Sequence, residues 1–280
     1  MHVNLFYQFY KSFCAFRPRI LNLRAVGVIS ILLLPAAQGM AQAVQPPAAQ
    51  PQAPSGPETV LAYKAWLGVG GREQEYCMGT QTLKIMRGQG PGSYIMNGNL
   101  RLKFSRVIEV TVEQDWSESW QDGNIIEFSG TSYEKHKVEA RHELHLQRSG
   151  SDIQLTATGN RRHPIMGPIR EAKSYKLTTD SVPASYWFEG LFMSKSKFFG
   201  IRTGEPFLVE RTQLQGEERV VFGGANFNAR HYSAHVKEEE GQRDFWYLPT
   251  GLLYRARFPA GEDRLVTYEL QPNQETARCG

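Results

Sequence analysis

The segment that decides the fold runs from Leu100 to Trp116 and reads Leu-Arg-Leu-Lys-Phe-Ser-Arg-Val-Ile-Glu-Val-Thr-Val-Glu-Gln-Asp-Trp. Apolar and polar side chains alternate along it, with the period of two that is typical of a strand with one buried and one solvated face. The alternation outlasts an ordinary strand, and its parity slips near Arg106 and Val107. The segment therefore predicts long, bent strands in a curved antiparallel sheet.

The same period recurs further along the chain. Val138, Ala140, His142, Leu144 and Leu146 share one parity, and Ile153, Leu155 and Ala157 repeat the pattern over a shorter stretch. Turn-forming pairs separate such runs, at Gly70-Gly71, Asp122-Gly123, Ser149-Gly150, Gln215-Gly216, Glu240-Gly241, Thr250-Gly251 and Ala260-Gly261. We expect about ten or more strands joined mostly by short hairpins. The predicted fold class is all-β, a curved antiparallel sheet or incomplete β-barrel with one short helical insert.

The first 58 residues predict export. A basic stretch ending at Arg24 precedes an apolar run of about ten residues and then a small-residue series ending at Ala43, which is the pattern of a secretory signal peptide. That run is about half the length of a membrane-spanning helix, so we predict no transmembrane span after cleavage. We assign residues 1–43 to a signal peptide, 44–58 to a Pro/Ala/Gln-rich tether and 59–280 to a single β domain. The predicted location is the periplasm.

The formal net charge of +4 belongs to the predicted leader. Lys11, Arg17, Arg19 and Arg24 are the charged residues before residue 42, so the rest of the chain is formally neutral. A neutral chain has no overall field that attracts phosphate backbones. We therefore predict no nucleic-acid partner.

Two cysteines remain after the predicted leader, Cys77 and Cys279. An oxidising compartment allows them to form a disulfide. Alternatively, Cys279 lies on a frayed tail and Cys77 is an ordinary small core residue. The sequence leaves both interpretations open.

The sequence lacks the common catalytic and nucleotide-binding motifs, and it predicts neither a metal site nor a cofactor. His142 and His145 are three residues apart on a predicted strand and project to opposite faces. His231 and His235 share a face but stand about 13 Å apart. Neither pair holds one metal ion without outside ligands.

Apart from His142, the candidate ligand-binding residues lie in two segments. Around the predicted helical insert, which runs from Asp180 to Met193, the aromatic residues are Tyr186, Trp187, Phe188, Phe192, Phe198 and Phe199. They either plug the concave face of the sheet or line an apolar groove for a lipid or acyl chain. In the predicted connection after Asn160, Arg161 and Arg162 suit an anionic head group or sugar phosphate, unless they are simply solvated. His142, on the apolar parity, is either a hydrogen-bonded core residue or part of a ligand site.

Several short motifs resemble a known family. They are Tyr63–Arg72, Pro183–Phe188, Arg202–Glu205, Ala229–Tyr232, Asp244–Tyr247 and Gly251–Leu253. In order and spacing they resemble DUF6134, a family of proteobacterial exported proteins of unknown activity, with DUF3108 as a more distant relative. The resemblance implies an exported, all-β, single-domain protein, and it carries no catalytic residues with it.

Together these observations favour a non-catalytic role in the cell envelope. The leading hypothesis is binding or carriage of an apolar or amphiphilic envelope component, or help with envelope assembly, with a lipid or an envelope protein as partner. A first alternative is an enzyme that acts on an envelope or saccharide substrate through Glu109, Glu113 and Asp115. A second alternative is a structural module that recognises a partner through an exposed sheet edge.

Overall fold

The structure is a computed structural model that describes residues 58–104, 110–135, 139–149, 152–163, 167–237, 241–260 and 264–279. The predicted signal peptide and the predicted tether up to residue 57 lie outside the described residues. The described part of the chain forms a 15-stranded sheet with two short helices. Neither of those helices is long and apolar enough to cross a membrane.

The first half of the sheet is an antiparallel meander in which each strand pairs with the next along the chain. Its strands are β1 (Glu58–Val69), β2 (Arg72–Arg87), β3 (Ser93–Phe104), β4 (Val110–Gln121), β5 (Asn124–Lys135), β6 (Glu139–Ser149), β7 (Asp152–His163) and β8 (Gly167–Leu177). Short reversals such as Gly70-Gly71 and Asp122-Gly123 connect them, with positive φ at all four residues.

The second half is a meander that returns toward the first. It contains β9 (Val182–Pro183), α2 (Glu189–Ser194), β10 (Lys197–Phe199), β11 (Pro206–Phe222), β12 (Ala225–Val236), β13 (Gln242–Tyr247), β14 (Leu253–Pro259), β15 (Arg264–Gln271) and α3 (Gln274–Ala277). The pairing of β1 with β15 joins the two halves, and β8 and β9 end the sheet. The parallel pair β9–β10 departs from the otherwise antiparallel order of the described strands.

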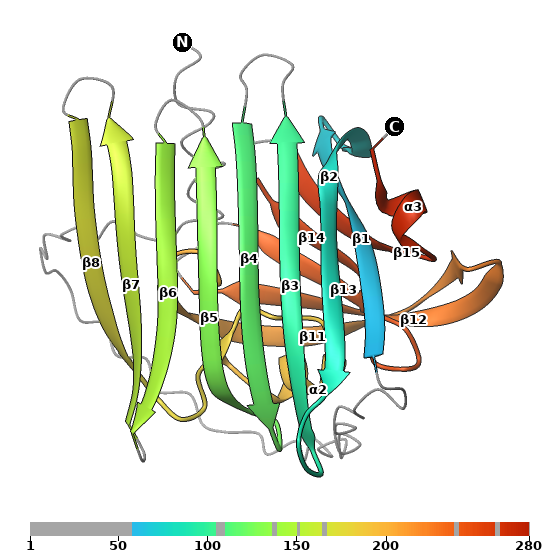
Figure 1. Cartoon of the computed structure of the whole chain (residues 1–280). Coiled ribbons are helices and arrows are strands. Elements are labelled where there is room, and N and C mark those ends of the chain that lie inside the picture. Colours follow the sequence, from blue (N-terminus) through green and yellow to red (C-terminus); the bar gives the residue numbers. More distant parts are fainter. Residues whose placement is uncertain are drawn as a thin grey trace, which may run out of the picture.

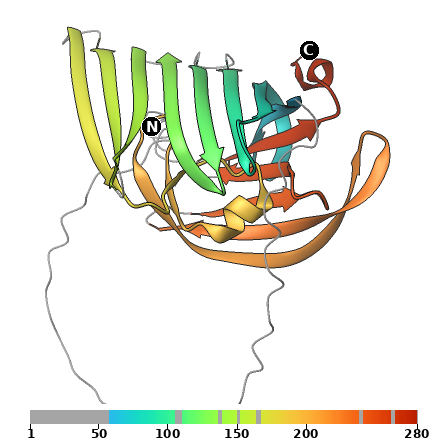
Figure 2. The same ribbon diagram turned by 60° about the horizontal axis from the view of Figure 1, so that its bottom comes forward.

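The sheet curls so that its two halves lie over one another. Figure 1 shows β1–β8 as one layer, with the strands of the second half crossing behind it. In Figure 2 the second half curves beneath the first, and α2 lies at the near end between them. Because β8 and β9 do not pair, the curl is an incomplete barrel. The predicted all-β class with a curved, mostly antiparallel sheet is confirmed.

The segment that decides the fold forms the end of β3 and most of β4. Leu102 pairs with Val112, so the strands run side by side in opposite directions. The apolar parity faces the interior, where Leu100 and Trp116 are buried. The slip in parity therefore marks a change of strand, while residues 105–109 themselves lie outside the described part.

One predicted turn is wrong. Gly216 lies inside β11, where the β11–β12 register shifts between Leu214 and Gly216. The register shift marks a β-bulge, and the φ of 142° at Gly216 is a backbone conformation that favours glycine. The chain reverses instead at Gly223-Gly224, and the β11–β12 hairpin projects beyond the rest of the sheet (Figures 1 and 2).

The predicted helix from Asp180 to Met193 is wrong in its first part. The helix α2 begins only at Glu189, and the residues before it include β9. The N–H of Ala184 donates to the carbonyl of Phe199 at 2.8 Å rather than to a carbonyl one turn away. Tertiary hydrogen bonds thus outweigh the local signal of a cap residue followed by proline.

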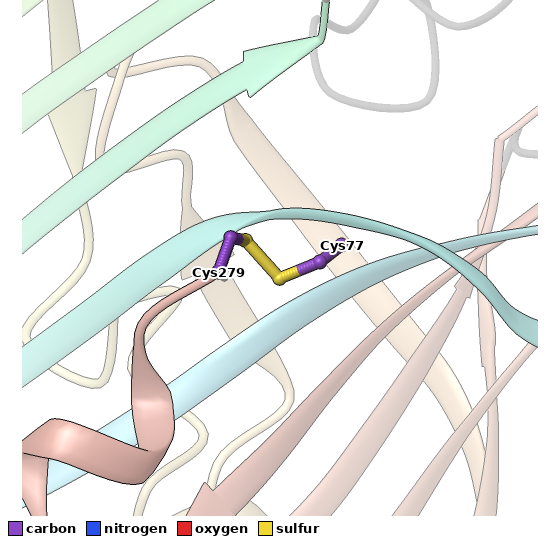
Figure 3. The surroundings of a disulfide bond; sticks show 2 residues. All are labelled: Cys77 and Cys279. Atoms are coloured by element: carbon purple, nitrogen blue, oxygen red, sulfur yellow. A yellow bond between two sulfur atoms is a disulfide. The ribbon is translucent and has the colours of Figure 1, made fainter.

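A disulfide joins Cys77 on β2 to Cys279 at the end of the chain (Figure 3). Their Cα atoms are 5.7 Å apart, and they are separated by 202 residues in sequence. The intervening helix α3 begins at the cap residue Asn273, whose side chain accepts from the N–H of Thr276. The bridge therefore fastens the tail beyond β15 onto β2, across the junction of the two halves.

Candidate functional site

A cavity of about 140 Å³ lies between the two halves of the sheet. The first half contributes side chains from β2, β3 and β4, and the second half contributes side chains from β11, β13, β14 and β15. Residues 184–187 and 200–205 complete the wall. Apolar residues such as Leu100, Leu253, Ala256 and Phe258 make up much of the lining. The cavity thus occupies the interior of the incomplete barrel.

Two buried glutamines give the first half of the wall a polar component. Gln81 on β2 and Gln114 on β4 lie on either side of Leu100 in one row of the sheet, and both are almost fully buried. Gln114 holds a position of the apolar parity, so it faces the interior as Leu100 and Trp116 do. Sequence reasoning missed this pair, although a polar residue on an apolar parity is the signal that identifies it.

The segment before α2 places two aromatic side chains in the cavity wall, those of Tyr186 and Trp187. The hydroxyl of Tyr247 donates to the carbonyl of Tyr186 at 2.8 Å, and the N–H of Leu253 donates to the carbonyl of Trp187 at 2.9 Å. The ring of Trp187 lies 5.2 Å from that of Tyr63 between centroids. Both backbone and rings are therefore fixed by the second half of the sheet and by β1.

Arg243 on β13 supplies a positive charge at the cavity. It is 7% exposed, and its Nη1 donates to the hydroxyl of Tyr186 at 3.0 Å. Its guanidinium lies 5.4 Å from the ring centroid of Phe207 and 5.6 Å from that of Phe258. Cation–π contacts of this kind offset part of the cost of burying the charge.

The loop between β10 and β11 brings further charges to the wall. Arg202, which is buried, forms an ion pair with the buried Glu134 of β5. Glu205 forms an ion pair with Lys173 of β8 at 3.3 Å. Gly204, with a φ of 73°, allows the tight turn between these residues. The loop thereby links the second half to β5 and β8.

The indole N–H of Trp187 is buried and has no hydrogen-bond partner among the described residues. A buried donor without an acceptor is costly, at about 1–3 kcal/mol. An acceptor atom inside the cavity would remove that cost. The wall therefore offers a ligand apolar contacts together with a few donors, among them Arg243.

A comparison with models of known protein families identifies the family of this chain. The model of the family described as Domain of unknown function (DUF6134) matches residues 77–271. The chain belongs to the DUF6134 family. The resemblance noted in the sequence is confirmed on this point, while the more distant one to DUF3108 stays a prediction.

A solved structure is similar to this DUF6134 protein in outline. It is the crystal structure of a beta-barrel-like protein of domain of unknown function DUF1849 from Brucella abortus, with 12% identity and a TM-score of 0.44. The match covers 76% of this chain and 95% of that one. No curated protein matches the chain.

The predicted aromatic residues of this DUF6134 protein fall into two groups. Trp187 lines the cavity, whereas Phe188, Phe192 and Phe198 are buried among other rings. Phe188 packs edge-on against Tyr94, with ring centroids 5.8 Å apart. The other ring neighbours are Phe245 and Tyr247 for Phe192, Tyr186 and Phe207 for Phe198, and Phe128 for Phe199. The structure thus combines the two interpretations, a core plug and a cavity wall.

The remaining predicted residues, Arg161, Arg162 and His142, lie on neighbouring strands of the first half. The connection predicted after Asn160 is wrong, because β7 continues to His163. Arg161 and Arg162 belong to β7, opposite Ala140 and Glu139 of β6, and their side chains lie outside the described ones. His142 on β6 is half-buried and is not among the residues that line the cavity. The described residues contain no cluster of three or more potential metal ligands.

Two of the carboxylates proposed for the enzymatic alternative lie outside the interior cavity. Glu113 and Asp115 of β4 are exposed on the outer face of the sheet, opposite to the parity of the buried Gln114. Asp115 is bound by Arg101 at 2.8 Å. Glu109 lies outside the described residues. Alternation along β4 thus directs Glu113 and Asp115 away from the interior cavity, and the enzymatic alternative stays a prediction.

A buried carboxyl group on β4 was also missed from the sequence. Glu118 of β4 is fully buried and accepts hydrogen bonds from the indoles of Trp116 and Trp120, at 2.9 and 2.8 Å, and from the hydroxyl of Ser185. Burial raises the pKa of Glu118 to about 7, outweighing these three hydrogen bonds, which lower it. Glu118 thereby ties the first half of the sheet to the segment that carries Tyr186 and Trp187.

Proposed function

We propose that this protein is exported to the periplasm and binds or carries an apolar or amphiphilic envelope component, without catalysing a reaction. The observation that carries the proposal is the interior cavity with its largely apolar lining. Binding sites for small molecules are typically concave and apolar with a few fixed polar groups. Gln81, Gln114, Arg243 and the indole N–H of Trp187 fit that description.

The size of the cavity limits what enters it. A volume of about 140 Å³ is close to that of engineered apolar cavities of about 150 Å³, which accept benzene. A group of about six carbons therefore fits inside, and a longer amphiphile extends out of the cavity. The proposal thus concerns part of an acyl chain or a ring, and not a whole diacyl lipid.

The exposed-edge alternative has weaker support. The strand β8 does end the sheet, but its 11 residues include Arg170, Lys173 and Lys176. Basic residues along an edge strand are a common means of preventing another strand from pairing there. We therefore place ligand binding ahead of partner recognition through β8.

The proposal is tested by native mass spectrometry with lipid extraction on protein recovered from the periplasmic fraction. We expect a co-purifying amphiphile that is released on denaturation. The variant Ala256→Leu adds three carbon atoms to the cavity wall and should lose this adduct. The matched control Ala225→Leu makes the same change at an exposed residue of the β11–β12 hairpin and should keep the adduct. Retention of the adduct in both variants would exclude the cavity as its binding site. Absence of the protein from the periplasm would refute export.

A further inference from the structure

A second pocket lies where the barrel fails to close. Its volume is about 330 Å³. It is lined by the end of β8, the connection from β8 to β9, the strand β10, the start of β11 and Lys237, just after β12. The pocket thus lies beside the connection between β8 and β9, the two end strands of the sheet. We call this the seam pocket.

Three lysines from separate parts of the chain line the seam pocket: Lys176, Lys197 and Lys237. The remaining lining combines the hydroxyl residues Thr178 and Ser181 with apolar side chains. Ammonium and hydroxyl groups at the edge of an apolar surface are the groups that bind a phosphate or a carboxylate.

Each lysine has a carboxylate neighbour, but that neighbour does not line the pocket. The ion pairs are Lys176–Asp152 at 3.5 Å, Lys197–Asp180 at 3.2 Å and Lys237–Glu210 at 3.8 Å. All six side chains are 41% or more exposed. Exposed ion pairs contribute little to the stability of a protein. An anion in the pocket can therefore replace these contacts at a small cost in free energy.

Phe207 lies between the seam pocket and the interior cavity, because it lines both. Its ring stacks on that of Phe198 with centroids 5.9 Å apart, and Phe198 also lines the seam pocket. On the cavity side the guanidinium of Arg243 lies over the same ring. A ligand in the cavity that is longer than about six carbons therefore reaches the lysines when the side chain of Phe207 moves aside.

We propose that the seam pocket binds the anionic head group of an amphiphile, a carboxylate or a phosphate, whose apolar tail lies in the interior cavity. The inference rests on the proposed function and adds the chemical class of the ligand. Burial of the apolar tail stabilises the complex, and contacts with the three lysines favour a negatively charged head group. The unclosed seam is then the entrance of the binding site.

The test is a calorimetric titration of the mature protein with four probes: octyl phosphate, octanoate, 1-octanol and inorganic phosphate. We expect octyl phosphate and octanoate to bind about tenfold more tightly than 1-octanol, the loss expected when a few partly exposed charge contacts are removed. Inorganic phosphate alone should bind at least about a hundredfold more weakly than octyl phosphate, because it gains nothing from the cavity.

A triple variant, Lys176→Gln, Lys197→Gln and Lys237→Gln, tests the lysines directly. The preference for charged probes should fall to within about twofold, while the dissociation constant of 1-octanol stays unchanged. The control Lys84→Gln removes a similarly exposed lysine, paired with Glu58 on the outer face, and should keep the full preference.

The outcomes separate the two proposals. Equal binding of octanoate and 1-octanol, or an unchanged preference in the triple variant, would overturn the head-group assignment and leave cavity binding intact. Inorganic phosphate that binds as tightly as octyl phosphate would also overturn it, since the seam would then be a simple anion site. Failure of all three octyl probes to bind would overturn both proposals.

Discussion

Removal of the disulfide should destabilise the protein strongly. The bridge between Cys77 and Cys279 closes a loop of 202 residues. In the chain-entropy model, a loop of that length constrains the unfolded chain by about 5 kcal/mol. For a domain of this size each kcal/mol corresponds to a shift of about 2–4 °C in melting temperature, so Cys279→Ser should melt about 10–20 °C lower.

The assay is thermal unfolding followed by circular dichroism, with and without a reducing agent. We expect the reduced wild type, Cys77→Ser and Cys279→Ser to melt together, well below the oxidised protein. The structural reason is the position of the bridge, which fastens the tail beyond β15 to β2 next to the β1–β15 pair. A loss below about 1 kcal/mol, or a wild type insensitive to reduction, would refute the reasoning.

Three further predictions concern the interior. Because burial raises the pKa of Glu118 to about 7, the folded protein takes up this proton at higher pH than the unfolded chain. Stability should fall by about 3 kcal/mol from pH 5 to pH 8, and urea unfolding of Glu118→Gln should lack this dependence. Gly98→Ala should destabilise by at least about 2 kcal/mol, because its Cβ would lie 2.0 Å from the Trp116 ring; Gly130→Ala, with its closest contact at 3.4 Å, should be tolerated in the same assay. Trp187→Ala should cost about 3–5 kcal/mol, and an unchanged melting temperature would contradict its packing in the core against Tyr63.

Alternation predicted which side chains lie inside, because it depends only on the local geometry of a strand. Leu144 and Leu146 are buried, as their parity predicts. The turns at Gly70-Gly71 and Asp122-Gly123, which need positive φ, could also be predicted from their residue types. These features need no knowledge of distant parts of the chain.

The candidate site depends on contacts between distant segments, which alternation does not describe. The segment with Tyr186 and Trp187 is fixed by hydrogen bonds to Tyr247 and Leu253. The helix predicted there from the local sequence was therefore wrong in its first part. Arg243 reaches the cavity because β13 packs opposite the first half of the sheet. The seam lysines lie on different elements and come together only when the sheet curls.

Gln114 and Glu118 show what the sequence could still have revealed. Both hold positions of the apolar parity on β4, and a polar residue at such a position needs an internal partner or a ligand. Glu118 has its partners in two indoles and a serine. Polar exceptions to an apolar parity were therefore better indicators of the interior site than the exposed carboxylates of the same strand.

The central claim is that an apolar group binds inside the incomplete barrel, and titration of octanoate into the wild type, Ala256→Leu and Ala225→Leu tests it most directly. We predict binding to the wild type and Ala225→Leu, and at least about a tenfold loss in Ala256→Leu with its fold retained. Equal binding to all three proteins would contradict the claim.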